Sequence, residues 1–283
     1  MAVFYHLPKQ FPLIIGCRDK IILFMIPQEP KLNNEVIGPT EHNRCRFVSL
    51  NNISVLKGDT QILEDVSVDI YSNDHIALVG PNGAGKTTLI ELLIGEEEPD
   101  SGTINTFSDF SIAYVPQSIE NIFPRRSNHS VIEYFYHARG LDVLRDRMFE
   151  IESKLAESGE WIESLIAEYG ELQTKFQLLG GYRIESDAEA IMRGLNLPYN
   201  IDLESPIESL SGGEKTKLFL AQALIGNADL LLLDEPSNHL DPDSIEWLGD
   251  YLRHYRGALM VTSHKPIFLS AFTNKGLKHI SRW

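Results

Sequence analysis

The chain has 283 residues, 43% hydrophobic and 23% charged, as in a globular protein with a sizeable core. Its formal net charge of −15 argues against a grip on nucleic acid or an anionic membrane through bulk electrostatics. Two cysteines are too few for a disulfide scaffold, and no apolar run approaches the about 20 residues that cross a bilayer. We therefore expect a cytoplasmic protein with no transmembrane segment of its own.

Residues 1–45 are expected to form an N-terminal extension and linker. The apolar runs at 11–15 and 21–26 flank a glycine-containing stretch and allow two short strands around a turn. An irregular, disordered extension is the alternative that we favour. Residues 27–43 are rich in Pro, Asn and charged residues, which is typical of a linker.

From Phe47 onward the pattern predicts strands. Residues 48–50, 62–63 and 66–70 alternate or cluster their apolar side chains, and a turn is expected at 57–59. Further strands are expected at Ile104 and at 112–115, the second of which ends before Gln117.

The segment Gly80–Thr88 fits the phosphate-binding pattern of Gly, four residues, then Gly-Lys-[Ser/Thr]. Its glycines allow backbone N–H groups to approach phosphate oxygens, Lys86 supplies a positive charge, and the Thr87 hydroxyl can bind Mg²⁺. An apolar strand at 75–79 precedes the loop and a leucine-rich helix follows it, as the motif requires. The candidate nucleotide-binding residues are Gly80, Pro81, Asn82, Gly83, Ala84, Gly85, Lys86, Thr87 and Thr88.

Residues 141–176 carry apolar side chains at spacings of three and four, interrupted at Ser158-Gly159. This pattern predicts an antiparallel helical hairpin of roughly 20 Å per arm, which turns at Gly159 and ends at Gly180-Gly181. Its tip is acidic. Periodicity does not distinguish a projecting hairpin from a helical subdomain packed on its neighbour, so both remain open.

Residues Leu210–Lys215 begin a helix, because Ser211 and Glu214 form a Ser-x-x-Glu capping box. The N-terminus of that helix offers a hydroxyl, the N–H groups of Gly212 and Gly213, and the positive end of the helix dipole, which suit a phosphate.

A buried strand at 230–233 ends in two acids, Asp234 and Glu235. The carboxyl end of a parallel strand is where open α/β sheets bind ligands, so we expect Asp234 to hold Mg²⁺ and Glu235 to accept a proton from water. Another strand, 259–263, is followed by His264.

The order of these motifs resembles the ATP-binding cassette (ABC) family from about Phe47 to His264. The resemblance implies an α/β fold, namely a P-loop NTPase of the ABC type with an antiparallel β subdomain and a helical hairpin insert. The cassette would occupy residues 46–283 and the insert about 126–210.

Roles follow from the resemblance at matching positions. Gln117 would contact the metal and the attacking water, Glu235 would be the general base, and His264 would sense the γ-phosphate. Ser211 and Gly213 would bind ATP held by a second cassette, in a homodimer or on a separate chain, and Asp241 would lie across the same interface.

Within the family, the ABC-F branch is most similar, on the run Glu235–Asp241 (Glu-Pro-Ser-Asn-His-Leu-Asp) and the hairpin leading to Gly-Gly-Tyr. The chain departs from that branch by having one cassette, and Lys57 stands where many cassettes stack an aromatic ring on adenine. The implied function is Mg²⁺-dependent ATP hydrolysis, with the ribosome as partner. The alternative is the ATP-binding subunit of a membrane transporter, whose permease is another chain.

Overall fold

The computed structural model describes residues 3–6, 22–26, 45–118, 129–157, 162–263 and 268. The chain divides into two compact units, which are described separately. The helical unit lies within residues 119–227, and the sheet unit is formed from residues 3–118 and 228–283. The helical insert predicted at about 126–210 falls inside the helical unit, which continues to Asn227.

A six-stranded sheet forms one layer of the sheet unit. Its strand order is β1 (Val3–His6), β7 (Ser111–Val115), β8 (Leu230–Asp234), β9 (Ala258–Thr262), β5 (His75–Val79) and β2 (Ile22–Ile26). The four central strands are parallel and the two edge strands are antiparallel to their neighbours. Every residue of β8 and β9 is buried, as expected from their continuous apolar sequences.

The edge strands β1 and β2 correct the favoured expectation for residues 3–6 and 22–26. Instead of an irregular extension, these nine residues pair with β7 and β5. The alternative of a strand at 21–26 is confirmed, while the run 11–15 lies outside the described residues. A physical reason is that β7 and β5 would otherwise expose unpaired backbone groups, which an extended apolar segment satisfies.

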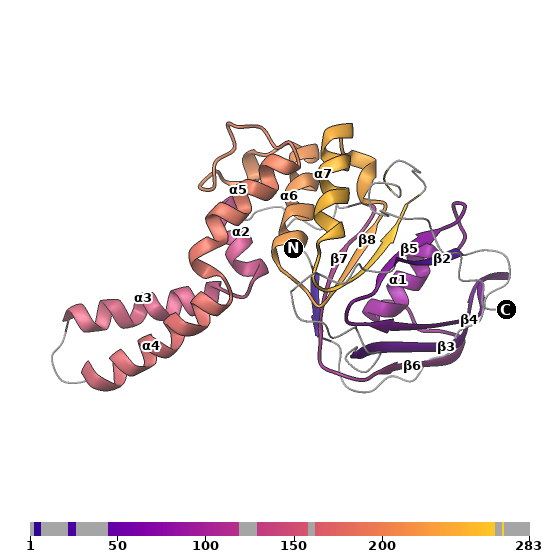
Figure 1. The fold of residues 1–283 in the computed structure, drawn as a ribbon, viewed down its shortest axis with the longest axis horizontal. Helices are drawn as coiled ribbons and strands as arrows, with labels where there is room; N and C mark the ends of the chain where they lie inside the picture. Colours follow the sequence, from indigo (N-terminus) through magenta and orange to yellow (C-terminus); the bar gives the residue numbers. More distant parts are fainter. Residues whose placement is uncertain are drawn as a thin grey trace, which may run out of the picture. The chain divides into compact units, whose positions relative to one another are not determined.

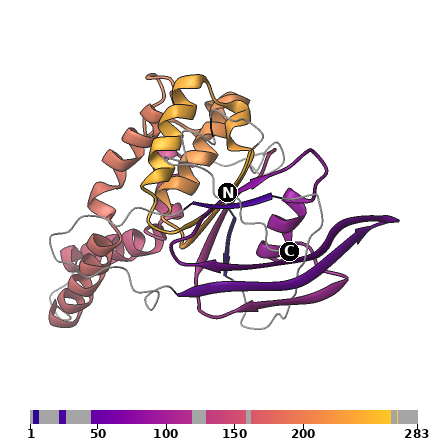
Figure 2. The same ribbon diagram turned by 45° about the vertical axis from the view of Figure 1, so that its right-hand side comes forward.

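The second layer is an antiparallel sheet of β4 (Thr60–Tyr71), β3 (Arg46–Lys57) and β6 (Ser101–Thr106). Figure 2 shows β3 and β4 as one long hairpin, where the sequence predicted several short strands. Bulges allow this continuity, because Asn52 and Asp65 adopt positive φ angles of 55° and 48°. Helix α1 (Lys86–Ile94) packs with both sheets into one hydrophobic core (Figure 1).

Two further helical segments of the sheet unit follow β8. They are the 3₁₀ turn η4 (Pro236–His239) and α7 (Pro242–Arg253).

The helical unit contains α2 (Val131–Ala138), α3 (Asp142–Glu157), α4 (Ile162–Leu178), η2 (Gly181–Arg183), α5 (Ile184–Gly194), η3 (Ile207–Ser209) and α6 (Gly212–Ile225). In Figure 1, α3 and α4 lie side by side and extend away from α2, α5 and α6 of the same unit. This arrangement favours the projecting hairpin over the packed subdomain.

The hairpin is held by polar contacts between its helices. The Arg147 guanidinium donates to both carboxylate oxygens of Glu168 at 2.7 and 3.0 Å, and the Tyr169 hydroxyl donates to Glu152 at 2.6 Å. Helix α4 ends at Leu178, and Gly180 follows two residues later with a φ of 74°, in agreement with the predicted end of the second arm at Gly180-Gly181. The predicted turn at Gly159 lies outside the described residues.

Candidate nucleotide-binding site

The candidate residues of the sheet unit converge on one edge of the parallel sheet. The phosphate loop follows β5, Asp234 ends β8, and Gln117 lies two residues beyond β7. Parallel register pairs Asp234 with Thr262 and Val115 with Leu233, so these strand ends lie side by side. This is the carboxyl edge, at which open α/β sheets bind their ligands.

Gly85 is required by the close approach of the loop to β4. Its φ is 91°, and a Cβ atom there would lie 2.7 Å from Leu63 Cδ2 and 3.0 Å from the Ile62 carbonyl oxygen. Gly83 also has a positive φ, of 78°, but its surroundings are open. The sequence predicted glycines for a tight turn, and the structure adds a packing reason at Gly85.

The Lys86 side chain is buried and folded back across its own loop. Its ammonium group donates to the carbonyl oxygens of Gly80 and Pro81 at 2.8 and 3.0 Å. Two neutral acceptors satisfy the charge but do not neutralise it. Lys86 is the first residue of α1, where the helix dipole is also positive. The remaining positive charge and the dipole together favour an anion at this point.

A hydrogen-bonded chain joins α1, β8 and β9 within this edge. The Thr87 hydroxyl donates to Asp234 Oδ2 at 2.7 Å, and the Thr262 hydroxyl donates to Asp234 Oδ1 at 2.5 Å. Thr262 Oγ1 also accepts the backbone N–H of Glu235 at 2.8 Å. The sequence analysis assigned no role to Thr262. The available signal was a threonine at the end of a strand that pairs with the acidic strand.

Glu235 is held in a left-handed backbone conformation, with φ of 51° and ψ of 48°. Such a conformation is uncommon outside glycine, asparagine and aspartate and marks functional sites when the surroundings enforce it. Here the backbone N–H of Glu235 is fixed by the hydroxyl and the carbonyl oxygen of Thr262. The Glu235 side chain is buried beside the Asp234 network.

Other predicted residues differ in their placement. Gln117 is exposed just beyond β7. Asp241 caps α7, because its carboxylate accepts the backbone N–H and the hydroxyl of Ser244 at 3.0 and 2.9 Å. His264 lies outside the described residues, so its role stays a prediction.

The predicted capping box at the start of α6 is confirmed. The Ser211 hydroxyl accepts the N–H of Glu214, and the Glu214 carboxylate accepts the N–H of Ser211 at 2.6 Å. Hydrogen bonds from the Ser211 hydroxyl and backbone N–H lower the pKa of Glu214 below its usual value. Ser211, Gly212 and Gly213 are exposed at this helix end.

The oxygen atoms at the sheet edge fit a magnesium ion. Thr87 Oγ1 and Asp234 Oδ2 are hard donors that lie 2.7 Å apart beside the phosphate loop. Among the described residues, no cluster of three or more His, Cys, Asp or Glu side chains could hold a metal by itself. One hydroxyl and one carboxylate oxygen are the donor set expected for Mg²⁺ when it is bound by one or two protein ligands together with substrate phosphates.

Lys57 lies at the end of β3 and is tied to carboxylates of the same unit. Its ammonium group lies 3.3 Å from Glu91 and 3.2 Å from Glu97. Hydrogen bonds and attraction from these two carboxylates exceed the opposing effect of burial and raise the pKa of Lys57.

Comparison with known proteins identifies the family. The family model described as "ABC transporter" matches residues 63–238. The chain belongs to the ATP-binding cassette family. This ABC cassette has the predicted fold class, and proteins of its family bind ATP.

Three curated relatives of the cassette illustrate the family match. The uncharacterized ABC transporter ATP-binding protein YfmM of Bacillus subtilis is 35% identical over 81% of the chain and 43% of YfmM. The tylosin resistance ATP-binding protein TlrC of Streptomyces fradiae is 32% identical over 80% and 41%, respectively. The energy-dependent translational throttle protein EttA of Mycobacterium tuberculosis is 30% identical over 78% and 38%. The chain thus spans about two fifths of the length of these relatives.

Solved structures support the fold of the cassette. An RNase-L inhibitor gives a TM-score of 0.53 at 22% identity, covering 83% of this chain and 37% of that one. A bacterial Atm1-family ABC exporter with ATP bound also gives 0.53, at 19% identity, covering 87% and 38%. Within the described residues of the cassette, no helix has the length and apolar character to span a membrane.

Proposed function

We propose that this cassette binds ATP with Mg²⁺ at the carboxyl edge of its parallel sheet and hydrolyses the γ-phosphate. The observation that carries the proposal is the hydrogen-bonded chain from Thr87 through Asp234 to Thr262 and Glu235. It ties the phosphate-binding helix to the acidic strand, so that a bound phosphate and the general base keep a fixed spacing. Positioning and charge stabilisation account for most of the catalysis of phosphoryl transfer.

The roles proposed for individual residues follow from this geometry and from the family. The loop backbone and Lys86 hold the phosphates, while Thr87 and Asp234 hold Mg²⁺, which neutralises phosphate charge when bound. Glu235 accepts a proton from the attacking water. Gln117 and His264 are proposed to contact the water and the γ-phosphate, respectively.

The second half of the site is proposed to come from another cassette. Ser211, Gly212 and Gly213 present a hydroxyl and N–H groups at the exposed start of α6. A γ-phosphate bound to the loop of one cassette and to this helix end of another would join the two. Asp241 is proposed to lie at the same interface.

We propose a cytoplasmic, ribosome-associated role of the ABC-F type. It is supported by the projecting α3–α4 hairpin, by the run Glu235–Asp241, and by the similarity to EttA, an energy-dependent translational throttle protein. The second candidate is the ATP-binding subunit of a membrane transporter, which the description of YfmM favours.

The first test removes the phosphate anchor. Because Lys86 carries its charge at the start of α1, Lys86→Ala should weaken ATP binding about 100-fold or more in calorimetry, a loss of about 2.7 kcal/mol. Lys175→Ala removes an exposed lysine of α4 and should leave the affinity unchanged. Equal affinity of Lys86→Ala and the wild type would refute the site.

The second test separates the two biological roles. Glu235→Gln with ATP should co-sediment with ribosomes at low salt, since slow hydrolysis prolongs the ATP-bound state. Wild-type protein with ADP is the control. Absence of co-sedimentation with nucleotide binding intact would favour the transporter subunit, and capture of a membrane protein would identify its permease.

A further inference from the structure

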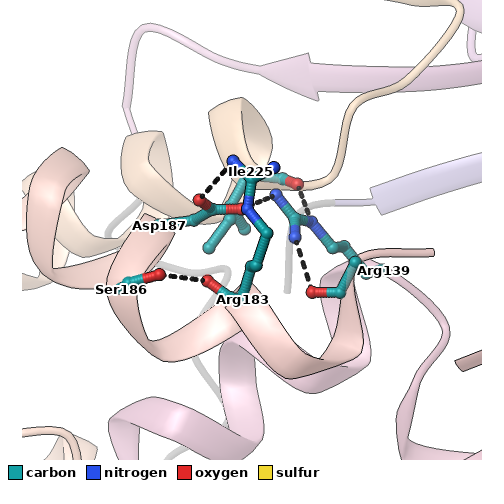
Figure 3. A network of polar contacts seen from close by, with 6 residues as sticks. Arg139, Arg183, Ser186, Asp187 and Ile225 are labelled. Carbon is teal, nitrogen blue, oxygen red and sulfur yellow. Dashed lines mark hydrogen bonds and ion pairs between the residues drawn. The ribbon is translucent and has the colours of Figure 1, made fainter. Parts of the chain in front are cut away.

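The guanidinium group of Arg139 lies where four helical segments of the helical unit meet. Its Nε–H donates to the carbonyl oxygen of Ile225, the last residue of α6, at 2.8 Å. Nη2 donates to Asp187 Oδ2 on α5 at 2.8 Å, and Nη1 donates to the Gly180 carbonyl oxygen at 3.4 Å. Figure 3 shows the Arg139 side chain reaching toward Asp187 and Ile225.

Arg139 lies just before the start of the α3–α4 hairpin and is bonded to its end. It follows α2 directly and is separated from α3 by two residues, and its partner Gly180 follows the end of α4. The Arg139 side chain is only 11% exposed, so its hydrogen bonds are shielded from water. The hairpin root and the C-terminal end of α6 are therefore bonded to the same planar group.

Helix α6 connects the Arg139 guanidinium at its C-terminal end to the capping box at Ser211, and it can move as one rigid element. Residues 218–225 are buried along its C-terminal half, whereas the Ser211 end is exposed. A helix of 14 residues is about 21 Å long and moves as a unit when its body is packed. A shift imposed at Ile225 is thus carried toward Ser211.

We propose that Arg139 is a positioning residue that joins the hairpin root to α6, so that displacement of the hairpin is transmitted to the phosphate-binding end of that helix. The inference rests on the proposed function, in which the Ser211 end contacts ATP of a second cassette. Arginine is needed because one planar fork donates in three directions, whereas a lysine ammonium is a single point of charge.

Two variants break the junction from opposite sides. Arg139→Lys keeps the charge but loses the fork. Gly180→Ala places a Cβ atom 2.9 Å from Nη1 and pushes the guanidinium out of place without touching α6. Gly140→Ala is the matched control, because Gly140 also has a positive φ, of 64°, at the other hairpin root but has open space around it.

A further control addresses the exposed ion pair on the same carboxylate. Arg183 lies 3.5 Å from Asp187 with its side chain 78% exposed, and Figure 3 shows it beside the junction. Arg183→Ala should behave like the wild type, because exposed pairs contribute little.

Hydrogen exchange of the full chain is the primary measurement, together with ATPase kinetics. In Arg139→Lys and Gly180→Ala, amides at both ends of α6 should exchange about tenfold faster, the effect of losing one charge-assisted bond. We expect kcat to fall about tenfold, KM for ATP to stay within about twofold, and the double variant to be no worse than either single one.

The outcomes separate the inference from the function on which it rests. Faster exchange at the C-terminal end of α6 alone, or equal effects of Gly180→Ala and Gly140→Ala, would overturn the inference. Additive losses in the double variant would overturn it as well. A wild-type protein without ATPase activity would refute the proposed function, while the exchange pattern would still decide whether Arg139 joins the hairpin to α6.

Discussion

Thr262 shares one hydroxyl group between two acidic residues of the site. The hydroxyl donates to Asp234 and accepts the backbone N–H of Glu235, so it orients together the carboxylate that we propose to bind Mg²⁺ and the residue that we propose as general base. In the proposed function Thr262 acts by holding Asp234 and Glu235 in place and does not itself need to contact the nucleotide.

Replacing Thr262 by valine preserves the shape and removes both hydrogen bonds. We expect kcat to fall by about 10- to 100-fold with ATP affinity nearly unchanged, and the free energy of unfolding to drop by about 1–3 kcal/mol. Thr262→Ser, which keeps the hydroxyl, should retain most of the activity. Steady-state kinetics and urea unfolding check both effects, and a fully active Thr262→Val enzyme would contradict them.

His75 gives the sheet unit a dependence of stability on pH. Burial lowers its pKa to about 4, and hydrogen bonds to the backbone of Tyr255 and Gly257 offset burial only in part. In the unfolded chain a histidine binds its proton near pH 6.5. Below that pH the unfolded state binds more protons than the folded one, so folding stability falls as pH decreases.

The expected loss between pH 6.5 and about 4 is on the order of 3 kcal/mol, at about 1.4 kcal/mol per pH unit. His75→Gln should remove this slope while other groups continue to titrate. Urea unfolding of both proteins across the window measures the difference, and parallel curves would show that the pKa of His75 is the same in the folded and unfolded states.

Two helices in the helical unit begin with the same capping box. In α2 the Ser130 N–H donates to Glu133 at 2.9 Å, and in α6 the Ser211 N–H donates to Glu214 at 2.6 Å. Both boxes should stabilise the start of their helix, because each satisfies N–H groups that have no partner within the helix. They differ because only α6 carries the glycines that leave its helix end open.

This pair separates capping from phosphate binding. Ser130→Ala and Ser211→Ala should each lower the free energy of unfolding by about 1 kcal/mol. Only Ser211→Ala should also weaken ATP-dependent pairing of cassettes, measured by light scattering with Glu235→Gln in the background. Equal pairing of the two variants would show that the start of α6 is a helix cap and nothing more.

At the scale of the whole molecule, the phosphate loop belongs to the sheet unit and the capping box of α6 to the helical unit. Each cassette offers one of each, and in the proposed function a complete site takes one from each of two cassettes. ATP then serves as the bridge, and hydrolysis removes it.

We therefore expect a monomer without nucleotide and a pair with ATP in Glu235→Gln, because loss of a general base typically slows turnover about 10²- to 10⁴-fold without removing a phosphate contact. Ser211→Arg should prevent pairing. Light scattering and ATPase rate per chain against protein concentration check this. A constant rate per chain from a monomer would refute the shared site, and activity that needs a second protein would indicate a separate partner cassette.

The sequence by itself determined the local features of this protein. The phosphate loop, the buried acidic strand, the α6 capping box and the end of the hairpin at Gly180 each depend on residues within a few positions of one another. These features can therefore be predicted from the turn residues and the periodicity of a single sequence.

Only the tertiary structure decided the contacts between distant segments. Thr262 meets Asp234 across 28 residues, Thr87 meets Asp234 across 147, and Arg139 meets Ile225 across 86. The strands at 3–6 and 22–26 likewise depend on open sheet edges formed far along the chain. Such contacts are set by strand register and helix packing. The residues that meet have no regular spacing in the sequence, so no local pattern predicts their contact.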